Sequence, residues 1–220
     1  MTVCGLIFFA VNAGVLAPAE SYSLRWDPKK GDASEFTFGM ETPGAEPKYV
    51  VSARLRQVVD SVTGEGYRTK TTNLGTDIRM GADEMRDARK TETTVDFDAR
   101  GMVKGFVGLR DSEARDAWSL GRVRSFVAPE KPVAVGGGWQ VVYPERGKIP
   151  GVRLSYTLRS VTDGRATVEM VVAGNDRERP EMGRGTWIID AKTGQWIAMD
   201  ATIRGLINDG KTTVALNLRR

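Results

Sequence analysis

Residues 54–67 read Arg-Leu-Arg-Gln-Val-Val-Asp-Ser-Val-Thr-Gly-Glu-Gly-Tyr, and residues 153–167 read Arg-Leu-Ser-Tyr-Thr-Leu-Arg-Ser-Val-Thr-Asp-Gly-Arg-Ala-Thr. Both stretches alternate between polar and apolar side chains, reach Ser-Val-Thr, turn at a glycine and begin a new alternating run. Alternation with a period of two is typical of β-strands, and a glycine turn between two such runs predicts a hairpin. The same hairpin is therefore expected once in each half of the chain.

A second pair of segments repeats in the same order. Residues 94–101, Thr-Val-Asp-Phe-Asp-Ala-Arg-Gly, correspond to residues 186–194, Thr-Trp-Ile-Ile-Asp-Ala-Lys-Thr-Gly. The recurrence of several landmarks in one order indicates an internal duplication. We expect a first β repeat at residues 20–110 and a second at residues 129–220, with the two repeats sharing one core.

The alternating runs have one apolar and one polar face, which favours an antiparallel sheet with one solvated side. Between the repeats, residues 111–128 are expected to form a connecting helix, because Ala114, Ala117 and Trp118 make a partial apolar stripe. The polar residues 81–90 are expected to form a further helical turn. The predicted fold class is mainly β: tandem antiparallel sheet repeats forming a sandwich or curved half-barrel with one intervening helix.

The composition excludes several classes of active site. The 220 residues contain no histidine and a single cysteine, Cys4. A Ser-His-Asp triad, a Cys-His pair, a histidine-ligated zinc and a cysteine-rich metal site are therefore impossible within them. The net charge of +4 comes from interspersed charges, which is typical of a solvated surface. We expect no catalytic residues, no cofactor, no metal site and no nucleic-acid partner.

Residues 1–19 have the features of a secretory signal peptide. An apolar run at residues 6–11 is followed by Ala17-Pro18-Ala19, which fits an A-x-A cleavage signal. The usual Lys or Arg before the apolar run is missing, which a start codon placed too far downstream would explain. A buried strand or helix is the alternative interpretation; Asn12 and Gly14 interrupt the run, which disfavours a transmembrane helix. We expect an exported protein, periplasmic or extracellular, that is soluble or peripherally attached in its mature form.

Two segments resemble a known group of proteins. Residues 126–139, Phe-Val-Ala-Pro-Glu-Lys-Pro-Val-Ala-Val-Gly-Gly-Gly-Trp, are similar to the P-x-K-P-V-x-V-G-x-x-W segment of exported bacterial cell-envelope proteins of unknown function. Residues 185–196 match the closing glycine–strand–Asp-x-x-Thr-Gly–strand hairpin of that group, although Gly137 replaces an aspartate before the tryptophan. No catalytic residues are established for that group, so the resemblance assigns none to this chain. More distantly, the architecture resembles the periplasmic lipoprotein carriers, which are half-barrels that hold a lipid chain.

The candidate ligand-binding residues are large apolar side chains of the second repeat: Trp139, Met170, Trp187, Trp196 and Met199. Large aromatic side chains can line a site for an apolar ligand, and packing in the core is the alternative interpretation. The expected function is therefore non-catalytic. It is the binding of an apolar ligand, such as a lipid, or of an envelope partner protein on the sheet surface.

Two other functions remain open. An Asp/Glu-dependent hydrolase needs two carboxylates within roughly 5–10 Å in a cleft. The candidate pairs are Glu84 with Asp87 and Glu178 with Glu181. A purely structural envelope module needs neither a concave apolar cavity nor a carboxylate pair.

Overall fold

The computed structural model describes residues 20–109, 111–147, 149–175, 181–206 and 212–220. The expected signal peptide, residues 1–19, and Glu178 of one candidate carboxylate pair lie outside the described residues. Among the helices of this described part, none is long and apolar enough to cross a membrane.

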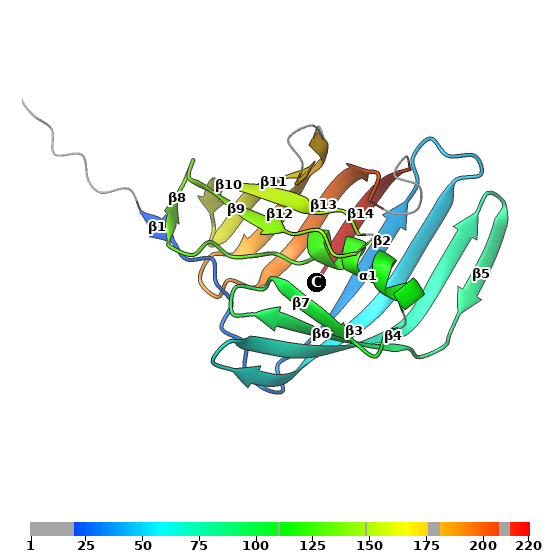
Figure 1. The fold of residues 1–220 in the computed structure, drawn as a ribbon, viewed down its shortest axis with the longest axis horizontal. Coiled ribbons are helices and arrows are strands. Elements are labelled where there is room, and N and C mark those ends of the chain that lie inside the picture. Colours follow the sequence, from blue (N-terminus) through cyan, green and yellow to red (C-terminus); the bar gives the residue numbers. More distant parts are fainter. Residues whose placement is uncertain (1–19, 110, 148, 176–180, 207–211) are drawn as a thin grey trace, which may run out of the picture.

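One long antiparallel sheet makes up most of the molecule (Figure 1), and its strands follow the order β7-β6-β4-β3-β2-β14-β13-β12-β11-β10-β9. The first half of the chain supplies β2 (Ala33–Glu41), β3 (Tyr49–Thr63), β4 (Gly66–Met80), β6 (Glu92–Asp98) and β7 (Val103–Val107). The second half supplies β9 (Gly138–Tyr143), β10 (Val152–Thr162), β11 (Arg165–Gly174), β12 (Glu181–Asp190), β13 (Trp196–Arg204) and β14 (Thr213–Arg219). β1 (Ser21–Tyr22) pairs with β8 (Val133–Ala134) in a separate small sheet.

Each half of the chain is a run of adjacent strands, and the halves join where β14 pairs with β2. The sheet is curved, and β7 and β9 form its two edges. The curvature brings these edges close together at one point, because the Tyr143 hydroxyl of β9 accepts a hydrogen bond of 3.3 Å from the Val103 N–H of β7. The predicted fold class, a mainly β curved sheet with one intervening helix, is confirmed.

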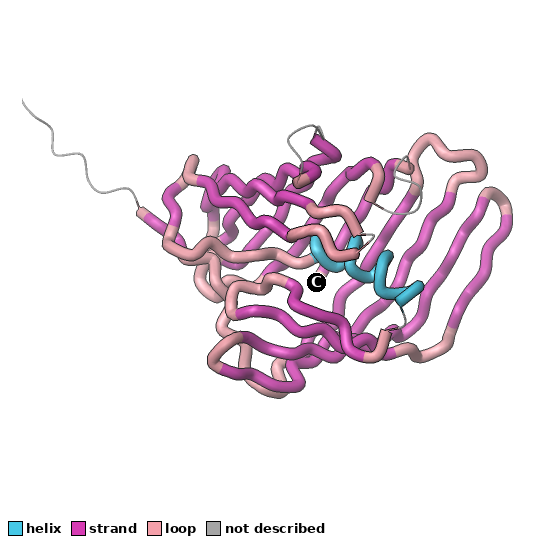
Figure 2. The backbone as a smooth tube through the Cα atoms, viewed as in Figure 1, coloured by secondary structure: helices cyan, strands magenta, loops and turns pink. Residues whose placement is uncertain are grey.

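Helix α1 (Asp111–Arg124) connects β7 to the second half and lies over the concave side of the sheet (Figure 2). It ends at Arg124, before the expected end at residue 128. The ring of Phe106 in β7 packs edge-on against Trp118 of the helix, with a centroid distance of 5.4 Å. It also lies over Gly121, where a Cβ would come within 2.6 Å of it. A glycine that weakens the helix in isolation therefore allows it to approach the sheet closely.

Residues 81–90 do not form the expected helical turn. They contain β5 (Asp83–Asp87), which pairs with the far end of β4 in the register Ile78 with Met85 and Met80 with Asp83. Gly81 makes the turn with a φ of 60°. Because the segment has no apolar stripe, packing does not stabilise a helix there, and the free edge of β4 offers backbone hydrogen bonds instead.

The two halves of the sheet share their irregularities. The β3–β4 pair has a register shift between Val59 and Ser61, and the β10–β11 pair has one between Leu158 and Ser160. In both hairpins the shift immediately precedes the Ser-Val-Thr sequence that the halves have in common. The second pair of repeated segments, residues 94–101 and 186–194, also has matching irregularities. The β6–β7 pair has a register shift before Phe97, and the β12–β13 pair has one before Ile189.

The segments that precede β2 and β9 also make matching contacts. Val59 accepts a hydrogen bond from the N–H of Gly31, and Leu158 accepts one from the N–H of Gly136. Each of these two strand residues also donates its own N–H to the carbonyl of the residue after that glycine. Val59 and Leu158 therefore occupy corresponding positions, and neighbouring residues can be matched between the halves by counting from them.

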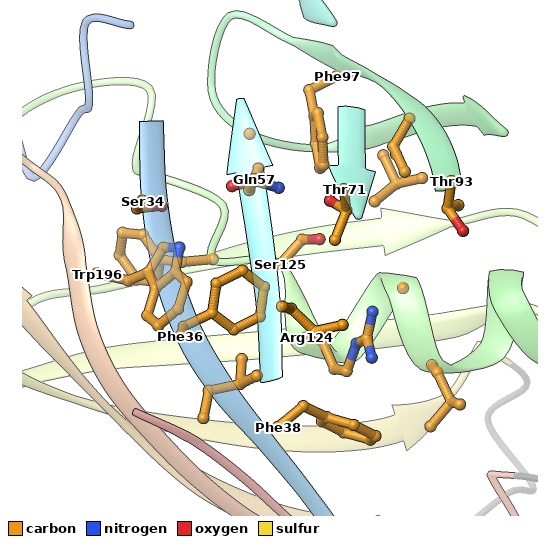
Figure 3. Close-up of a pocket in the computed structure, with 18 of the residues that line it drawn as sticks. Ser34, Phe36, Phe38, Gln57, Thr71, Thr93, Phe97, Arg124, Ser125 and Trp196 are labelled. Carbon is orange, nitrogen blue, oxygen red and sulfur yellow. The ribbon is translucent and has the colours of Figure 1, made fainter. Parts of the chain in front are cut away.

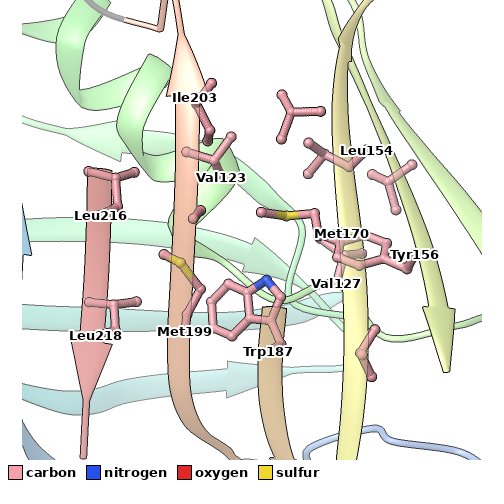
Figure 4. Packing of buried hydrophobic residues seen from close by; sticks show 14 of the residues in the cluster. Val123, Val127, Leu154, Tyr156, Met170, Trp187, Met199, Ile203, Leu216 and Leu218 are labelled. Atoms are coloured by element: carbon pink, nitrogen blue, oxygen red, sulfur yellow. The ribbon is translucent and has the colours of Figure 1, made fainter. Parts of the chain in front are cut away.

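The densest core lies on the second half of the sheet (Figure 4). Its largest fully buried side chains are Leu154, Tyr156, Leu158, Met170, Trp187, Ile189, Met199, Ile203 and Leu218. Val123 of α1 and Val127 after it complete this packing from the helix side. Residues of the first half such as Phe38 and Val95 belong to the same cluster, so the halves are joined by continuous apolar contacts.

Candidate ligand-binding cavity

A cavity of about 410 Å³ lies between the concave face of the first half of the sheet and helix α1 (Figure 3). Strands β2, β3, β4, β6 and β7 line one side, and α1 with the residues that follow it lines the other. The volume falls within the roughly 300–1,000 Å³ that is usual for small-molecule sites. The cavity is therefore large enough for an organic ligand.

Apolar side chains form much of the lining. Alternation along β2 directs Phe36 and Phe38 to the concave face, and Leu55 of β3 lies beside Phe36 in the sheet register. Trp196 of β13 packs edge-on against Phe36, with the ring centroids 5.1 Å apart. Phe126, which follows the helix, contributes from the opposite side. Such a lining favours hydrocarbon over water.

A row of polar side chains crosses the same concave face. Ser34, Gln57, Thr71 and Thr93 are successive cross-strand partners on β2, β3, β4 and β6. All four line the cavity (Figure 3). The Gln57 amide donates a hydrogen bond of 3.3 Å to the hydroxyl of Thr69, which fixes the orientation of the amide. The cavity thus has hydrogen-bonding groups on its sheet side in addition to its apolar wall.

The matching row in the second half is filled with large side chains. Trp139, Tyr156, Met170 and Gly185 are successive cross-strand partners on β9, β10, β11 and β12. Trp139 stacks on Tyr156 with a centroid distance of 5.1 Å, and Met170 is completely buried. The volume that these side chains fill in the second half is left open by the shorter polar side chains of the first.

The five residues predicted from the sequence lie in different environments. Trp196 lines the cavity. Met170, Trp187 and Met199 are fully buried in the core, and Trp139 is half-buried with its indole N–H donating to the Val127 carbonyl at 2.8 Å. The structure therefore brings Trp196 alone of these five into the cavity lining.

The counterparts of these five residues in the first half all line the cavity: Ser34 for Trp139, Thr71 for Met170, Val95 for Trp187, Val103 for Trp196 and Phe106 for Met199. Four of the five counterparts are smaller than the residue they match. The sequence echoes contained this signal, because aligning the two halves places small or polar residues opposite large apolar ones.

Arg124, the last residue of α1, was not anticipated from the sequence. Its side chain lines the cavity, and its Cζ atom lies 4.7 Å from the centre of the Phe38 ring. Its Nε is buried without a hydrogen-bond partner among the described residues. Desolvation by the surrounding protein lowers the pKa of Arg124 to about 10, so the guanidinium remains charged at neutral pH.

Two further arginines contribute to the lining. Arg100 is neutralised by Glu130, with 2.6 Å between Nη1 and the carboxylate, and its Nε donates to the Ala128 carbonyl at 2.8 Å. Arg220 donates from Nη1 to the side-chain oxygen of Gln195 at 2.8 Å, and desolvation lowers its pKa. Among the described lining residues there is no Asp or Glu, so the charged side chains of the cavity lining are all cationic.

The described carboxylates of the candidate hydrolase pairs lie outside this lining. Glu84 is exposed on β5, and Asp87 accepts hydrogen bonds from Arg89, which lower the pKa of Asp87 to about 2. Glu181 is exposed and bonded to Arg184 at 2.5 Å. Over the described part of the chain, no cluster of three or more His, Cys, Asp or Glu residues could hold a metal ion.

No protein-family model matches the chain, and no curated protein matches it. Solved structures that are similar to it include the following two. A Bacteroides fragilis protein of YmcC-like fold, inferred to be exported, is 9% identical over 91% of this chain and 98% of its own, with a TM-score of 0.33. A domain inferred to belong to an outer membrane lipoprotein-sorting protein of Vibrio parahaemolyticus is 12% identical over 85% of this chain and 84% of its own, with a TM-score of 0.31. Neither similarity defines a family or a ligand for this chain.

Proposed function

We propose that this protein is a non-catalytic, extracytoplasmic cell-envelope protein that holds an apolar ligand, such as a lipid chain, in the cavity between α1 and the first half of the sheet. The observation that carries the proposal is the cavity of about 410 Å³, with Phe36, Leu55, Phe126 and Trp196 in its lining. A hydrocarbon chain in this cavity would leave water and make dispersion contacts with these side chains. The extracytoplasmic location is supported by the signal-peptide features of residues 1–19.

A ligand inside the cavity is better supported than a partner protein on the outer face of the sheet. The alternation along β3 directs Ala53 and Leu55 inward and leaves Arg54 and Arg56 exposed on the convex face. An apolar partner surface would have to desolvate such charges, which is costly unless they are paired. The apolar surface of this half is therefore available mainly from within the cavity.

The other two functions have less support. A hydrolase that uses Asp and Glu needs carboxylates next to its substrate, and the described cavity lining contains none. A purely structural module would gain stability by filling the cavity, as Trp139, Tyr156 and Met170 do in the second half. A protein with a cavity lined by polar side chains is less stable than one in which apolar side chains fill the same volume. Ligand binding would explain why this protein has the cavity.

Native mass spectrometry of the protein, purified from its own envelope without detergent, tests this function. We expect a bound species that is released on denaturation and identified as a lipid or another amphiphile. The matched control is the double variant Gln57→Tyr/Thr71→Met, which carries the side chains of the second half and should purify without the adduct. A wild-type protein with a ligand-free mass that also binds no added amphiphile would contradict the proposal.

A further inference from the structure

Arg122 and Arg124 lie close together at the end of α1 but have different surroundings. Arg122 donates a hydrogen bond of 2.8 Å to the Pro150 carbonyl and one of 3.1 Å to the Trp118 carbonyl. Arg124 has none of these contacts: its Nε is buried without a partner, and no described carboxylate lies within salt-bridge distance of it. One arginine is therefore part of the scaffold, while the other directs an unpaired charge into the cavity.

Arg124 is half-buried, and its Nε is buried without a hydrogen-bond partner among the described residues. Such an arrangement is unusual, because removing part of a charged group from water is costly unless an opposite charge or a set of acceptors replaces the water. The Phe38 ring offers a cation–π contact with Arg124, which compensates for part of this cost. The planar fork of N–H donors remains available, and it matches the two oxygens of a carboxylate or phosphate. The other charged lining residues, Arg100 and Arg220, are also cations. A ligand with an anionic group would supply the negative charge that the side chains of the lining lack.

We propose that the cavity binds an anionic amphiphile, in which a carboxylate or phosphate head group pairs with Arg124 and the hydrocarbon chain lies against the apolar wall that includes Phe36, Leu55 and Phe126. The proposal rests on the proposed function, because it specifies the ligand class of the same cavity. The polar row offers further donors on the sheet side, among them the hydroxyls of Thr71 and Thr93. The two head groups share one recognition chemistry, namely an oxyanion bound by the guanidinium.

Titration calorimetry with three ligands of equal chain length tests the head group. Dodecanoate, dodecyl phosphate and dodecanol are titrated into the full-length mature protein after any co-purified ligand has been removed by unfolding and refolding. We expect the two anions to bind about tenfold or more tightly than the alcohol, which is the effect of one charge-assisted interaction. In Arg124→Met, we expect the anions to lose this advantage while the affinity for dodecanol changes little. Arg124→Gln serves in its place if the methionine variant does not fold.

Two controls separate the possible sources of the effect. Arg54→Gln removes a positive charge from the exposed face of β3, and it should retain the preference for the anions. Inorganic phosphate and acetate, titrated without a hydrocarbon chain, should bind at least about tenfold more weakly than the matching amphiphiles. Binding of inorganic phosphate as tight as that of dodecyl phosphate would mean that the site takes a free anion, and this would overturn the proposal.

The outcomes distinguish this proposal from the function on which it rests. Equal binding of all three amphiphiles by the wild-type protein, or a preference for the anions that survives in the Arg124 variant, would overturn the role of Arg124 but retain an apolar ligand. Failure of the folded wild-type protein to bind any of the three would overturn the apolar-ligand function itself. Circular dichroism of each variant establishes that the sheet is intact before its affinity is compared.

Discussion

Thr71 and Met170 occupy corresponding positions in β4 and β11, yet Thr71 faces the cavity while Met170 is completely buried in the core. Thr71 pairs with Gln57, and Met170 pairs with Tyr156. In both halves the register shift follows two residues further along the strand, after Val59 and after Leu158. The backbones around both pairs carry the same irregularity. The size of the inward-facing side chains therefore determines which half of the sheet carries a packed core and which carries the cavity.

Filling the cavity should remove ligand binding without damaging the sheet. The double variant Gln57→Tyr/Thr71→Met introduces the residue types that stand at the corresponding positions of the second half, where a similar backbone accommodates them. We expect unchanged or increased stability, because the buried apolar area grows. Affinity for dodecanoate should fall about tenfold or more, which calorimetry measures. Thr72→Met, on the opposite face of β4, is the control and should bind normally. Normal binding by the double variant would show that the ligand lies elsewhere.

Truncation to alanine should destabilise the protein much more at Met170 than at the corresponding Thr71. Met170→Ala leaves a void in a close-packed core and should lower the free energy of unfolding by about 2–5 kcal/mol. Thr71→Ala shortens a side chain of the cavity lining, where no close-packed neighbour loses its contacts, and its effect should stay below about 1 kcal/mol. Urea denaturation of both variants measures the difference. Equal losses would mean that the first half is as tightly packed as the second.

The neighbouring arginines of α1 should differ in their effect on stability. Arg124→Met removes an unpaired, desolvated charge and should raise the free energy of unfolding of the ligand-free protein by about 1–2 kcal/mol. Arg122→Met should lower it, because the carbonyls of Trp118 and Pro150 lose buried hydrogen bonds. Chemical denaturation of the two variants and the wild-type protein decides the sign. A clear loss of stability in Arg124→Met would mean that this guanidinium is satisfied in the ligand-free protein.

Three tyrosines with desolvated hydroxyls should make the fold sensitive to alkali. Burial desolvates the hydroxyls of Tyr67, Tyr143 and Tyr156 and raises the pKa of each above its ordinary value of 10.0. Because each pKa is higher in the folded than in the unfolded state, this stability is fully present below about pH 10 and is lost as the pH rises further. Unfolding free energies measured across this range should fall, and tyrosinate absorbance of these residues should appear only with unfolding. Full ionisation of every tyrosine near pH 10 in the folded protein would contradict this expectation.

Local patterns made much of the fold predictable. The hairpins around residues 63–66 and 162–165 follow from alternation that meets a glycine turn, and both are present in the structure. The helical turn predicted at residues 81–90 is wrong, because the charged residues of this segment carry no periodic signal and its structure depends on pairing with the free edge of β4. The candidate residues were chosen by size and aromaticity, a criterion that selects the core as readily as a ligand site.

Alternation, turn residues and composition can be read along the chain, so the antiparallel strands, the echoed hairpins and the absence of histidine-based chemistry follow from the amino-acid order. The presence of a cavity over the first half of the sheet and of a packed core over the second depends on the folded arrangement of the strands. Free volume depends on the summed sizes of side chains such as Ser34, Gln57, Thr71 and Thr93, which strand pairing brings into one row. The unpaired charge of Arg124 was decided in the same way, since only the packing of α1 over the sheet determines which groups its guanidinium meets.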